Sequence, residues 1–225
     1  MSQTIPKIIH QIWIGEKKPP YIWIDTWKND YITKYPEWKY MLWDNEKSKE
    51  ILNKYPKMKA IFNEEKKWCG KADILRYIIL YEYGGVYIDA DSTWVNEKDL
   101  GKLITDTNES GVFAANHNHE NIDLLANGVF GCIKQSPIIL EIIRELEKYT
   151  VRKYREKRLR RGPSKVTGPV LFSQIRKHNV TMFPPVFFYP IHWEGITNIN
   201  HHKYMDLPKE SYMFQYGLTT NSLDF

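Results

Sequence analysis

Residues 71–91 constrain the fold of this chain more than any other stretch. From residue 69 to 83, apolar side chains recur at spacings of three and four, which is typical of a helix with a buried face. Two glycines follow, and glycine often ends a helix because it adopts the left-handed cap conformation. The apolar run 86–88 then predicts a short buried strand that leads directly into an Asp-Ala-Asp sequence.

The rest of the sequence alternates strand-like and helix-like segments. Strands are expected at 7–14, 38–43, 86–88, 111–115 and 125–133, and helices at 20–31, 45–55, 69–83, 137–149 and after Thr167-Gly168-Pro169. Strands that alternate with helices predict an α/β fold with a mostly parallel central sheet. Because no repeat or long linker divides the 225 residues, we expect a single domain, with donor binding in about 1–115 and the acceptor side in about 116–225.

Composition narrows the class of protein. The net charge of +5, from 32 basic and 27 acidic residues, suits an anionic ligand without requiring nucleic acid, so no nucleic-acid partner is expected. Cys69 and Cys132 lie far apart and are expected to be free thiols. The sequence shows neither a secretory leader nor an apolar run of about 18 residues. These features predict a cytoplasmic protein whose membrane contact is at most peripheral.

The Asp-Ala-Asp sequence, Asp89-Ala90-Asp91, carries the first candidate chemistry. In an extended segment, residues two apart project to the same side, so both carboxylates could share one divalent ion. Mn²⁺ and Mg²⁺ prefer oxygen ligands and commonly complete their coordination with substrate phosphates. Alone, such a pair is more often a solvated turn, but here it follows an apolar strand, where ligands of open α/β sheets collect.

Asp73 and Arg76 form the second candidate group. They are three residues apart on the predicted helix and therefore share one face. An ordinary helix ion pair is the simpler interpretation of this spacing alone. Their position just before the Gly-Gly pair and the two aspartates makes a joint site the better hypothesis.

These blocks resemble glycosyltransferase family 32, which contains mannosyltransferases, and the glucosylating domains of large clostridial toxins. The resemblance rests on Ala72-Asp73-Ile-Leu-Arg76-Tyr, on Gly84-Gly85-Val-Tyr87-Ile-Asp89-Ala-Asp91, and on the opening segment Ile5-Pro6-Lys7-Ile8-Ile9-His10-Gln11-Ile12-Trp13-Ile14-Gly15. It implies a GT-A fold, a nucleotide-binding α/β sandwich. It also implies a retaining, metal-dependent transfer of a sugar from a UDP- or GDP-sugar to an acceptor hydroxyl, on a glycan.

The resemblance also implies roles for individual residues. Trp13 would stack on the donor base, Tyr87 would contact ribose or base, Asp89 would bind ribose or share the metal, and Asp91 would bind the metal directly. Asp73, Arg76 and Asn127 would act at the donor sugar as catalytic residues, and Thr167 and Gly168 would lie near the reacting centre with the donor. The implied cofactor is Mn²⁺ or Mg²⁺.

The C-terminal region departs from the family pattern, in which paired histidines, a tryptophan and a Ser-Trp sequence supply a last metal contact. Gln215 or Asn221 could offer a neutral oxygen instead. Residues 211–225 include small polar residues and a glycine, so we expect them to form a flexible lid with little contribution to the core.

Other features leave alternatives open. The histidines at 117, 119, 201 and 202 are expected to be exposed loop residues rather than a metal site. The basic run 152–161 could bind nucleic acid, an anionic glycan or a membrane surface, but a solvated helix end or loop is favoured, with a phosphate-bearing acceptor second. A nucleotide-sugar hydrolase and a non-catalytic nucleotide-sugar or glycan binder remain rivals to the transferase.

Overall fold

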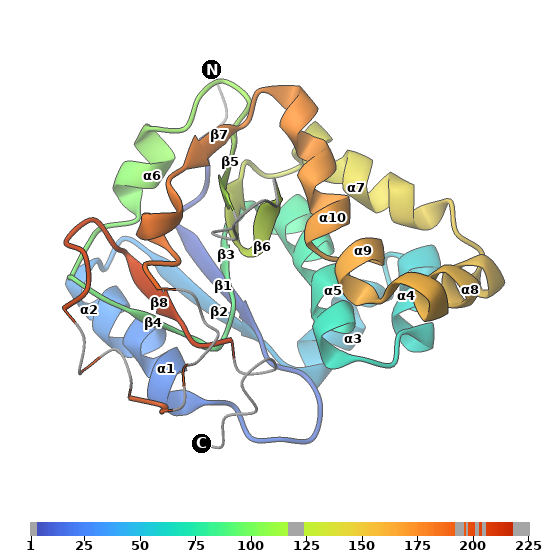
Figure 1. Ribbon diagram of the computed structural model, residues 1–225, viewed down its shortest axis with the longest axis horizontal. Coiled ribbons are helices and arrows are strands. Elements are labelled where there is room, and N and C mark those ends of the chain that lie inside the picture. Colours follow the sequence, from blue (N-terminus) through green and yellow to red (C-terminus); the bar gives the residue numbers. More distant parts are fainter. Residues whose placement is uncertain are drawn as a thin grey trace.

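The computed structural model describes residues 4–116, 124–191, 196, 198–200, 203 and 206–217. A six-stranded sheet with strand order β2-β1-β3-β6-β5-β7 lies at its centre (Figure 1). The sheet strands are β1 (Ile8–Ile12), β2 (Lys39–Trp43), β3 (Gly85–Ile88), β5 (Val112–Asn116), β6 (Leu125–Cys132) and β7 (Thr181–Phe183). Only β6 is antiparallel to its neighbours, β3 and β5, so the mostly parallel sheet predicted from the sequence is confirmed.

Two layers cover the sheet (Figure 1). One side holds helices α3 (Asn45–Leu52), α4 (Pro56–Glu64), α5 (Trp68–Tyr83), α7 (Pro137–Glu147), α8 (Val151–Arg161), α9 (Pro163–Val166) and α10 (Pro169–Phe172). The other side holds α1 (Tyr21–Asp25), the π-helix η1 (Thr26–Tyr31), α2 (Ile32–Lys34), α6 (Gly101–Thr105) and a small sheet of β4 (Ser92–Trp94) and β8 (Met213–Gln215). The 3₁₀ helices η2 (Ser173–His178) and η3 (Pro185–Phe187) flank β7.

Strand β3 shows why the sheet is sealed on both faces. All four of its residues are buried, and successive side chains enter opposite cores. Tyr87 belongs to the core beneath α5, whereas Val86 and Ile88 belong to the core formed with η1 and α6. An apolar strand is therefore held firmly at the point where it delivers the two aspartates to the edge of the sheet.

The Gly-Gly pair is required by both geometry and space. Gly84 and Gly85 have φ angles of 65° and 100°, a region that L side chains rarely adopt. A Cβ at Gly85 would lie 2.6 Å from the carbonyl oxygen of Ile8 on the neighbouring strand. The glycines therefore let α5 turn directly into β3 and bring the face of the helix next to the end of the strand.

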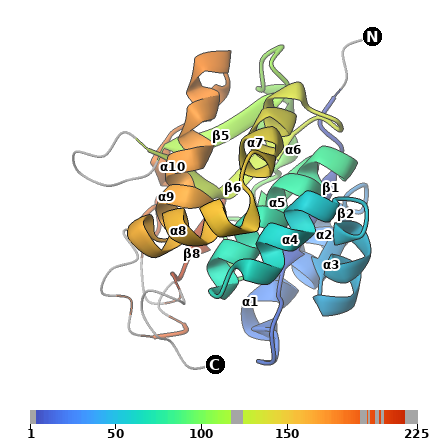
Figure 2. The same cartoon turned by 90° about the vertical axis from the view of Figure 1, so that its right-hand side faces the viewer.

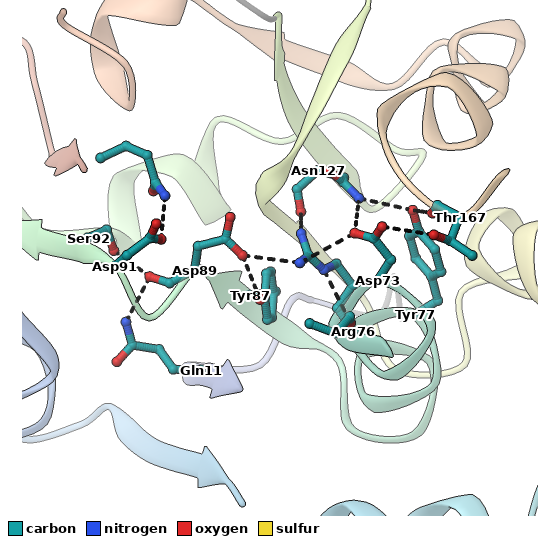
Figure 3. Close-up of polar contacts among 12 residues, drawn as sticks. Gln11, Asp73, Arg76, Tyr77, Tyr87, Asp89, Asp91, Ser92, Asn127 and Thr167 are labelled. Carbon is teal, nitrogen blue, oxygen red and sulfur yellow. Dashed lines mark hydrogen bonds and ion pairs between the residues drawn. The ribbon is translucent and has the colours of Figure 1, made fainter. Parts of the chain in front are cut away.

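Strand β6 is irregular beside the candidate site. Its pairing with β5 shifts so that Ala114 lies opposite Phe130 while the next residue, Ala115, lies opposite Ala126. Residues 127–129 are thus left out of this ladder, which is typical of a bulge that reorients side chains near a functional site. The bulge contains Asn127, whose side chain points toward α5 (Figure 3).

The C-terminal strand corrects one expectation. Residues 211–216 are buried, β8 pairs with β4, and the ring of Tyr216 stacks on that of Trp23 with centroids 4.4 Å apart. The small core contribution expected of this segment is therefore wrong for 211–216, because Tyr212 and Met213 belong to one core and Phe214 and Tyr216 to another. The remainder of the expected lid, 218–225, lies outside the described residues, as do the four histidines.

Two further expectations can be assessed. Cys69 and Cys132 are both free, as predicted. No helix in the described part of the chain is long and apolar enough to cross a membrane. The cytoplasmic location stays a prediction, as does the division into donor and acceptor regions.

The buried C-terminal strand leads to a stability prediction. Phe214→Ala removes a side chain that is 1% exposed, and we expect it to lower the free energy of unfolding by about 3–5 kcal/mol. Leu159→Ala, at a side chain that is 80% exposed, is the matched control and should change it by less than about 0.5 kcal/mol. Urea denaturation followed by tryptophan fluorescence measures both. Equal, small effects would show that 211–216 is not part of the core.

Candidate active site

The candidate site lies at the edge of the sheet where β1 and β3 end. These strands are parallel, so the residues that follow them share an edge, as the sequence predicted. The side-chain amide of Gln11 donates to the carbonyl oxygen of Asp89 at 3.1 Å and joins the two strand ends (Figure 3). Trp13 follows β1 at this edge, is partly exposed, and donates from its indole nitrogen to the carbonyl oxygen of Lys17 at 2.8 Å.

Arg76 is the centre of the polar cluster. It is 4% exposed and its guanidinium lies 3.4 Å from a carboxylate oxygen of Asp73 and 3.2 Å from one of Asp89. It also donates to the backbone carbonyl of Asn127 at 2.5 Å. The Asp73–Arg76 ion pair expected on one helix face is present, but the same guanidinium also bridges α5 to the turn after β3 (Figure 3).

Asp73 collects two further donors from distant parts of the chain. The Asn127 side-chain amide donates to one carboxylate oxygen at 2.8 Å, and the Thr167 hydroxyl donates to the other at 2.9 Å. A Cβ at Gly168 would lie 3.2 Å from the Asp73 carboxylate and 3.0 Å from the backbone of Ser164, so this position favours glycine. The structure therefore brings together six of the residues that the sequence singled out: Asp73, Arg76, Asp89, Asn127, Thr167 and Gly168.

Tyr87 has a different environment from the one expected of a donor contact. Its side chain is 1% exposed, its ring lies beneath the Arg76 guanidinium at 4.4 Å, and its hydroxyl donates to Asp89 at 2.7 Å. These contacts orient the guanidinium and the carboxylate on either side of it. Direct contact between Tyr87 and a donor stays a prediction.

Burial sets the charge state of Asp73. Its pKa is raised from 3.8 to about 6, first because burial disfavours the charged form and also because Asp89 carries like charge. Arg76, Thr167 and Asn127 oppose this increase by stabilising the carboxylate. For Arg76, burial favours the neutral form, but the carboxylates of Asp89 and Asp73 and the two tyrosines Tyr87 and Tyr77 raise its pKa, so it stays charged.

The two aspartates are oriented differently from the prediction. Asp89 and Asp91 lie in a turn between β3 and β4 rather than in an extended segment, because β4 leaves the main sheet and pairs with β8. Asp89 faces Arg76 and Tyr87, whereas a carboxylate oxygen of Asp91 accepts from the Gln215 amide at 2.5 Å. The turn is partly buried, so the solvated turn considered as an alternative is also not what forms.

Gln215 provides the observation that bears on a metal. Its side chain is 7% exposed, and its amide oxygen is buried without a hydrogen-bond partner within the described residues. An unsatisfied buried oxygen is costly, and a cation beside Asp91 would satisfy it. In the described part of the chain no three His, Cys, Asp or Glu side chains group closely enough to hold a metal ion. The oxygen donors at this turn are the carboxylates of Asp89 and Asp91 and the amide oxygen of Gln215. Such a donor set fits a hard divalent ion that shares its coordination with phosphates.

Several residues of the site were not identified from the sequence. The Tyr77 hydroxyl donates to the backbone carbonyl oxygen of Thr167 at 2.7 Å. The Ser92 hydroxyl donates to the backbone carbonyl oxygen of Asp89 at 2.7 Å. A Cβ at Gly128 would lie 2.6 Å from the Asp89 carboxylate and 3.0 Å from the Tyr189 hydroxyl. Three of these residues lie beside ones that the sequence singled out: Tyr77 follows Arg76, Ser92 follows Asp91 and Gly128 follows Asn127. Tyr189 comes from a segment without a motif.

The raised pKa of Asp73 gives a pH prediction. Because the folded pKa lies above the unfolded one, the stabilisation is complete below about pH 4 and is lost as pH rises through 6. Relative to Asp73→Asn, wild type should therefore lose about 2–3 kcal/mol of unfolding free energy between pH 4 and 7. Denaturant unfolding at both pH values measures this difference. The control, exposed Asp30→Asn, should track wild type; an Asp73→Asn difference independent of pH would contradict the assignment.

Comparison with known proteins agrees with this geometry. Residues 23–109 match the family described as "Glycosyltransferase sugar-binding region containing DXD motif". This segment is therefore similar to the sugar-binding regions of glycosyltransferases. It spans α1 to α6 and includes Asp73, Arg76, Tyr87, Asp89 and Asp91. The recognition made from the sequence is therefore confirmed.

Similar curated proteins include two fungal enzymes and a viral protein. Inositol phosphoceramide mannosyltransferase 3 of Schizosaccharomyces pombe is 31% identical over 66% of this chain and 39% of its own length. Mannosyl phosphorylinositol ceramide synthase SUR1 of Saccharomyces cerevisiae is 32% identical over 65% of this chain and 36% of its own. The uncharacterized glycosyltransferase L373 of Acanthamoeba polyphaga mimivirus is 32% identical over 63% of this chain and 55% of its own length. The chain thus spans about a third to a half of these relatives.

Solved structures confirm the fold. The PaToxG glycosyltransferase superposes with a TM-score of 0.56 at 21% identity, covering 79% of this chain and 70% of its own. The glycosyltransferase GlyE of Streptococcus pneumoniae has a TM-score of 0.52 at 16% identity, covering 94% of this chain and 54% of its own. The UDP-bound glycosyltransferase domain of the YGT toxin has a TM-score of 0.51 at 10% identity, covering 81% of this chain and 80% of its own. The segment that matches the sugar-binding family therefore lies within a GT-A fold.

Proposed function

We propose that the protein is a retaining glycosyltransferase that moves a hexose from a UDP- or GDP-sugar to an acceptor hydroxyl. One observation carries the proposal: a single buried arginine, Arg76, joins the sugar-side residues Asp73 and Asn127 to the first aspartate of the DXD turn. The GT-A fold and the DXD-containing region support it. The names of the fungal relatives suggest mannose as the transferred sugar.

Asp73 and Asn127 are proposed to bind the hydroxyl groups of the donor sugar. The Asp73 carboxylate is already fixed by Asn127 and Thr167, so it presents a rigid acceptor. Arg76 is proposed to stabilise charge on the leaving diphosphate, since its fork of donors and its buried position strengthen such an interaction. Trp13, at the end of β1 and partly exposed, remains the proposed stacking partner of the nucleotide base.

Asp89, Asp91 and the Gln215 amide oxygen are the proposed ligands of a divalent ion, Mn²⁺ or Mg²⁺. When bound, the ion would neutralise negative charge on the diphosphate. The orphaned oxygen of Gln215 supports this assignment, because it is a neutral donor on a side chain that already contacts Asp91. Asn221, the alternative ligand considered from the sequence, lies outside the described residues.

Attack from the same face as the leaving group is proposed for the transfer. Each carboxylate of the cluster accepts hydrogen bonds from its neighbours: Asp73 from Asn127, Asp89 from Tyr87 and Asp91 from Gln215. These carboxylates are thus engaged in holding the site, and the leaving phosphate is the proposed acceptor of the proton. Nuclear magnetic resonance of the first-formed product tests this through the anomeric configuration.

The acceptor is proposed to be a hydroxyl of a glycan or of a polyol headgroup. The fungal relatives are named for inositol phosphoceramide, and an inositol ring offers the same secondary hydroxyl chemistry as a sugar. Donor turnover measured with and without acceptors of both kinds separates the rivals. Metal-dependent turnover independent of acceptor indicates a hydrolase, and binding without turnover indicates a binder.

Gln215 provides a sharp test of the metal site. Gln215→Glu places a carboxylate beside Asp91, so we expect the metal-free protein to melt earlier, because the amide hydrogen bond is replaced by charge repulsion. The stabilisation by MnCl₂ with UDP or GDP should increase, because an anionic ligand binds the ion more strongly. Thermal-shift titrations measure both. Exposed Gln174→Glu is the control, and Asp91→Asn should abolish the metal-dependent shift. An unchanged shift in both site variants would remove the metal assignment.

Arg76 provides a test of catalysis. Arg76→Lys keeps the charge but loses the planar fork that reaches Asp73 and Asp89 together, so turnover should fall by about 100-fold. Steady-state rates per folded molecule, from circular dichroism of the same sample, separate catalysis from stability. Full activity per folded molecule, with early melting, would reduce Arg76 to a structural ion pair.

A further inference from the structure

Helix α8 concentrates positive charge. Seven of its 11 residues are Arg or Lys and one is Glu, which gives the helix a formal charge of +6. The other residues of the chain, 25 basic and 26 acidic, together carry −1, so this helix accounts for the whole excess of +5. Such a distribution is a localised cationic surface rather than the evenly mixed charge of an ordinary soluble face.

Some of these cations are held by carboxylates and others are not. Arg155 forms a bidentate pair with Glu64 at 2.6 and 2.8 Å, and Arg152 pairs with Glu156 on the helix itself at 2.9 Å. Within the described residues, the exposed side chains of Lys153, Arg160 and Arg161 have no carboxylate partner. These three are the cations available to an external anion.

The helix is fixed to the body of the protein. Tyr154 is buried, and its hydroxyl donates to Glu65 at 2.6 Å, as does the Arg158 guanidinium at 2.6 Å. The Glu65 side chain is fully buried and also accepts the backbone N–H groups of Lys66 and Lys67 just before α5. Contacts with Glu65 therefore fix α8 and its cationic face to the start of α5, the helix that carries Asp73.

An exposed apolar side chain lies within the charged surface. Leu159 is 80% exposed, the highest value among the large hydrophobic residues of the described chain, and it is flanked by Arg158 and Arg160. Soluble polyanions offer phosphates or sulfates to the arginines but no apolar medium for an aliphatic side chain. An anionic bilayer offers both, because headgroup charge lies directly above acyl chains.

The helix also leads directly to the candidate site. A single residue, Gly162, separates α8 from α9, and Thr167, which follows α9, donates to the Asp73 carboxylate at 2.9 Å. Figure 2 shows α8 and α9 side by side on the outer surface of the helical layer. A surface bound through α8 would thus lie near the segment that holds the donor-sugar residues.

We propose that α8 docks the protein on anionic phospholipid bilayers. Lys153, Arg160 and Arg161 contact the headgroups, and Leu159 inserts between the headgroups. The inference rests on the proposed function only for its purpose, which is to present a lipid-borne acceptor to the site. Binding itself needs neither donor nor turnover, so the two proposals can fail separately.

Co-sedimentation of the purified chain with vesicles tests the docking. Vesicles of phosphatidylcholine with 30 mol% phosphatidylserine should bind, pure phosphatidylcholine should not, and 0.5 M NaCl should weaken binding at least tenfold. Lys153→Gln/Arg160→Gln/Arg161→Gln should lower the partition coefficient by about 100-fold. The matched control, Lys28→Gln/Lys49→Gln/Lys57→Gln, removes three exposed lysines from other elements and should stay within threefold of wild type.

Leu159→Ser distinguishes a bilayer from a soluble polyanion. It should weaken vesicle binding about tenfold while leaving binding to heparin or duplex DNA unchanged, because only the bilayer buries the side chain. Equal losses in the two triple variants would show non-specific charge attraction and overturn the proposal. Tight binding to duplex DNA or heparin with no binding to the anionic vesicles would overturn it in favour of a polyanion site.

Discussion

The buried ion pairs of Arg76 are the constraint on which the rest of the site depends. One guanidinium serves two carboxylates, Asp73 on α5 and Asp89 after β3; Arg76 and Asp73 are buried, and Asp89 is partly exposed. Burying the charges of Arg76 and Asp73 is costly unless geometry and hydrogen bonds compensate. The compensation here comes from Asn127, Thr167 and Tyr87, each supplied by a different segment. The contacts that hold the candidate site in place are therefore the same contacts that hold the surrounding elements together.

The polar contacts around Arg76 also explain several local irregularities of the backbone. The bulge in β6 aims the Asn127 amide at Asp73 and its carbonyl at Arg76. Gly128 leaves room for the Asp89 carboxylate, and Gly168 leaves room for that of Asp73. Burial is the main cause that raises the pKa of Asp73, and the like charge of Asp89 adds to it. A positively charged occupant beside Asp89 and Asp91 would offset the contribution of Asp89.

Local sequence patterns predict the helices and strands around the site, but they do not predict the contacts between segments that are distant in the sequence. The helix before Gly84, the strand after it and the helix expected from residue 137 follow from period, cap and turn chemistry, and all three form. The pairing of β4 with β8 could not be read from either segment, because three-residue strands have too little pattern. Burial of the tail segment 211–216 cannot be predicted for the same reason, because its aromatic residues find their partners, such as Trp23, only in the folded chain.

The contact between Gln215 and Asp91 also has a consequence for how the protein is made. The two residues are separated by 124 positions, one of the longest sequence separations of any polar contact described above. Contacts this distant form late, because the entropy of closing so large a loop must be offset by other interactions. During synthesis, the DXD turn emerges well before the strand that completes it. A ribosome-bound chain would thus contain Asp91 well before Gln215, its hydrogen-bond partner, has been synthesised.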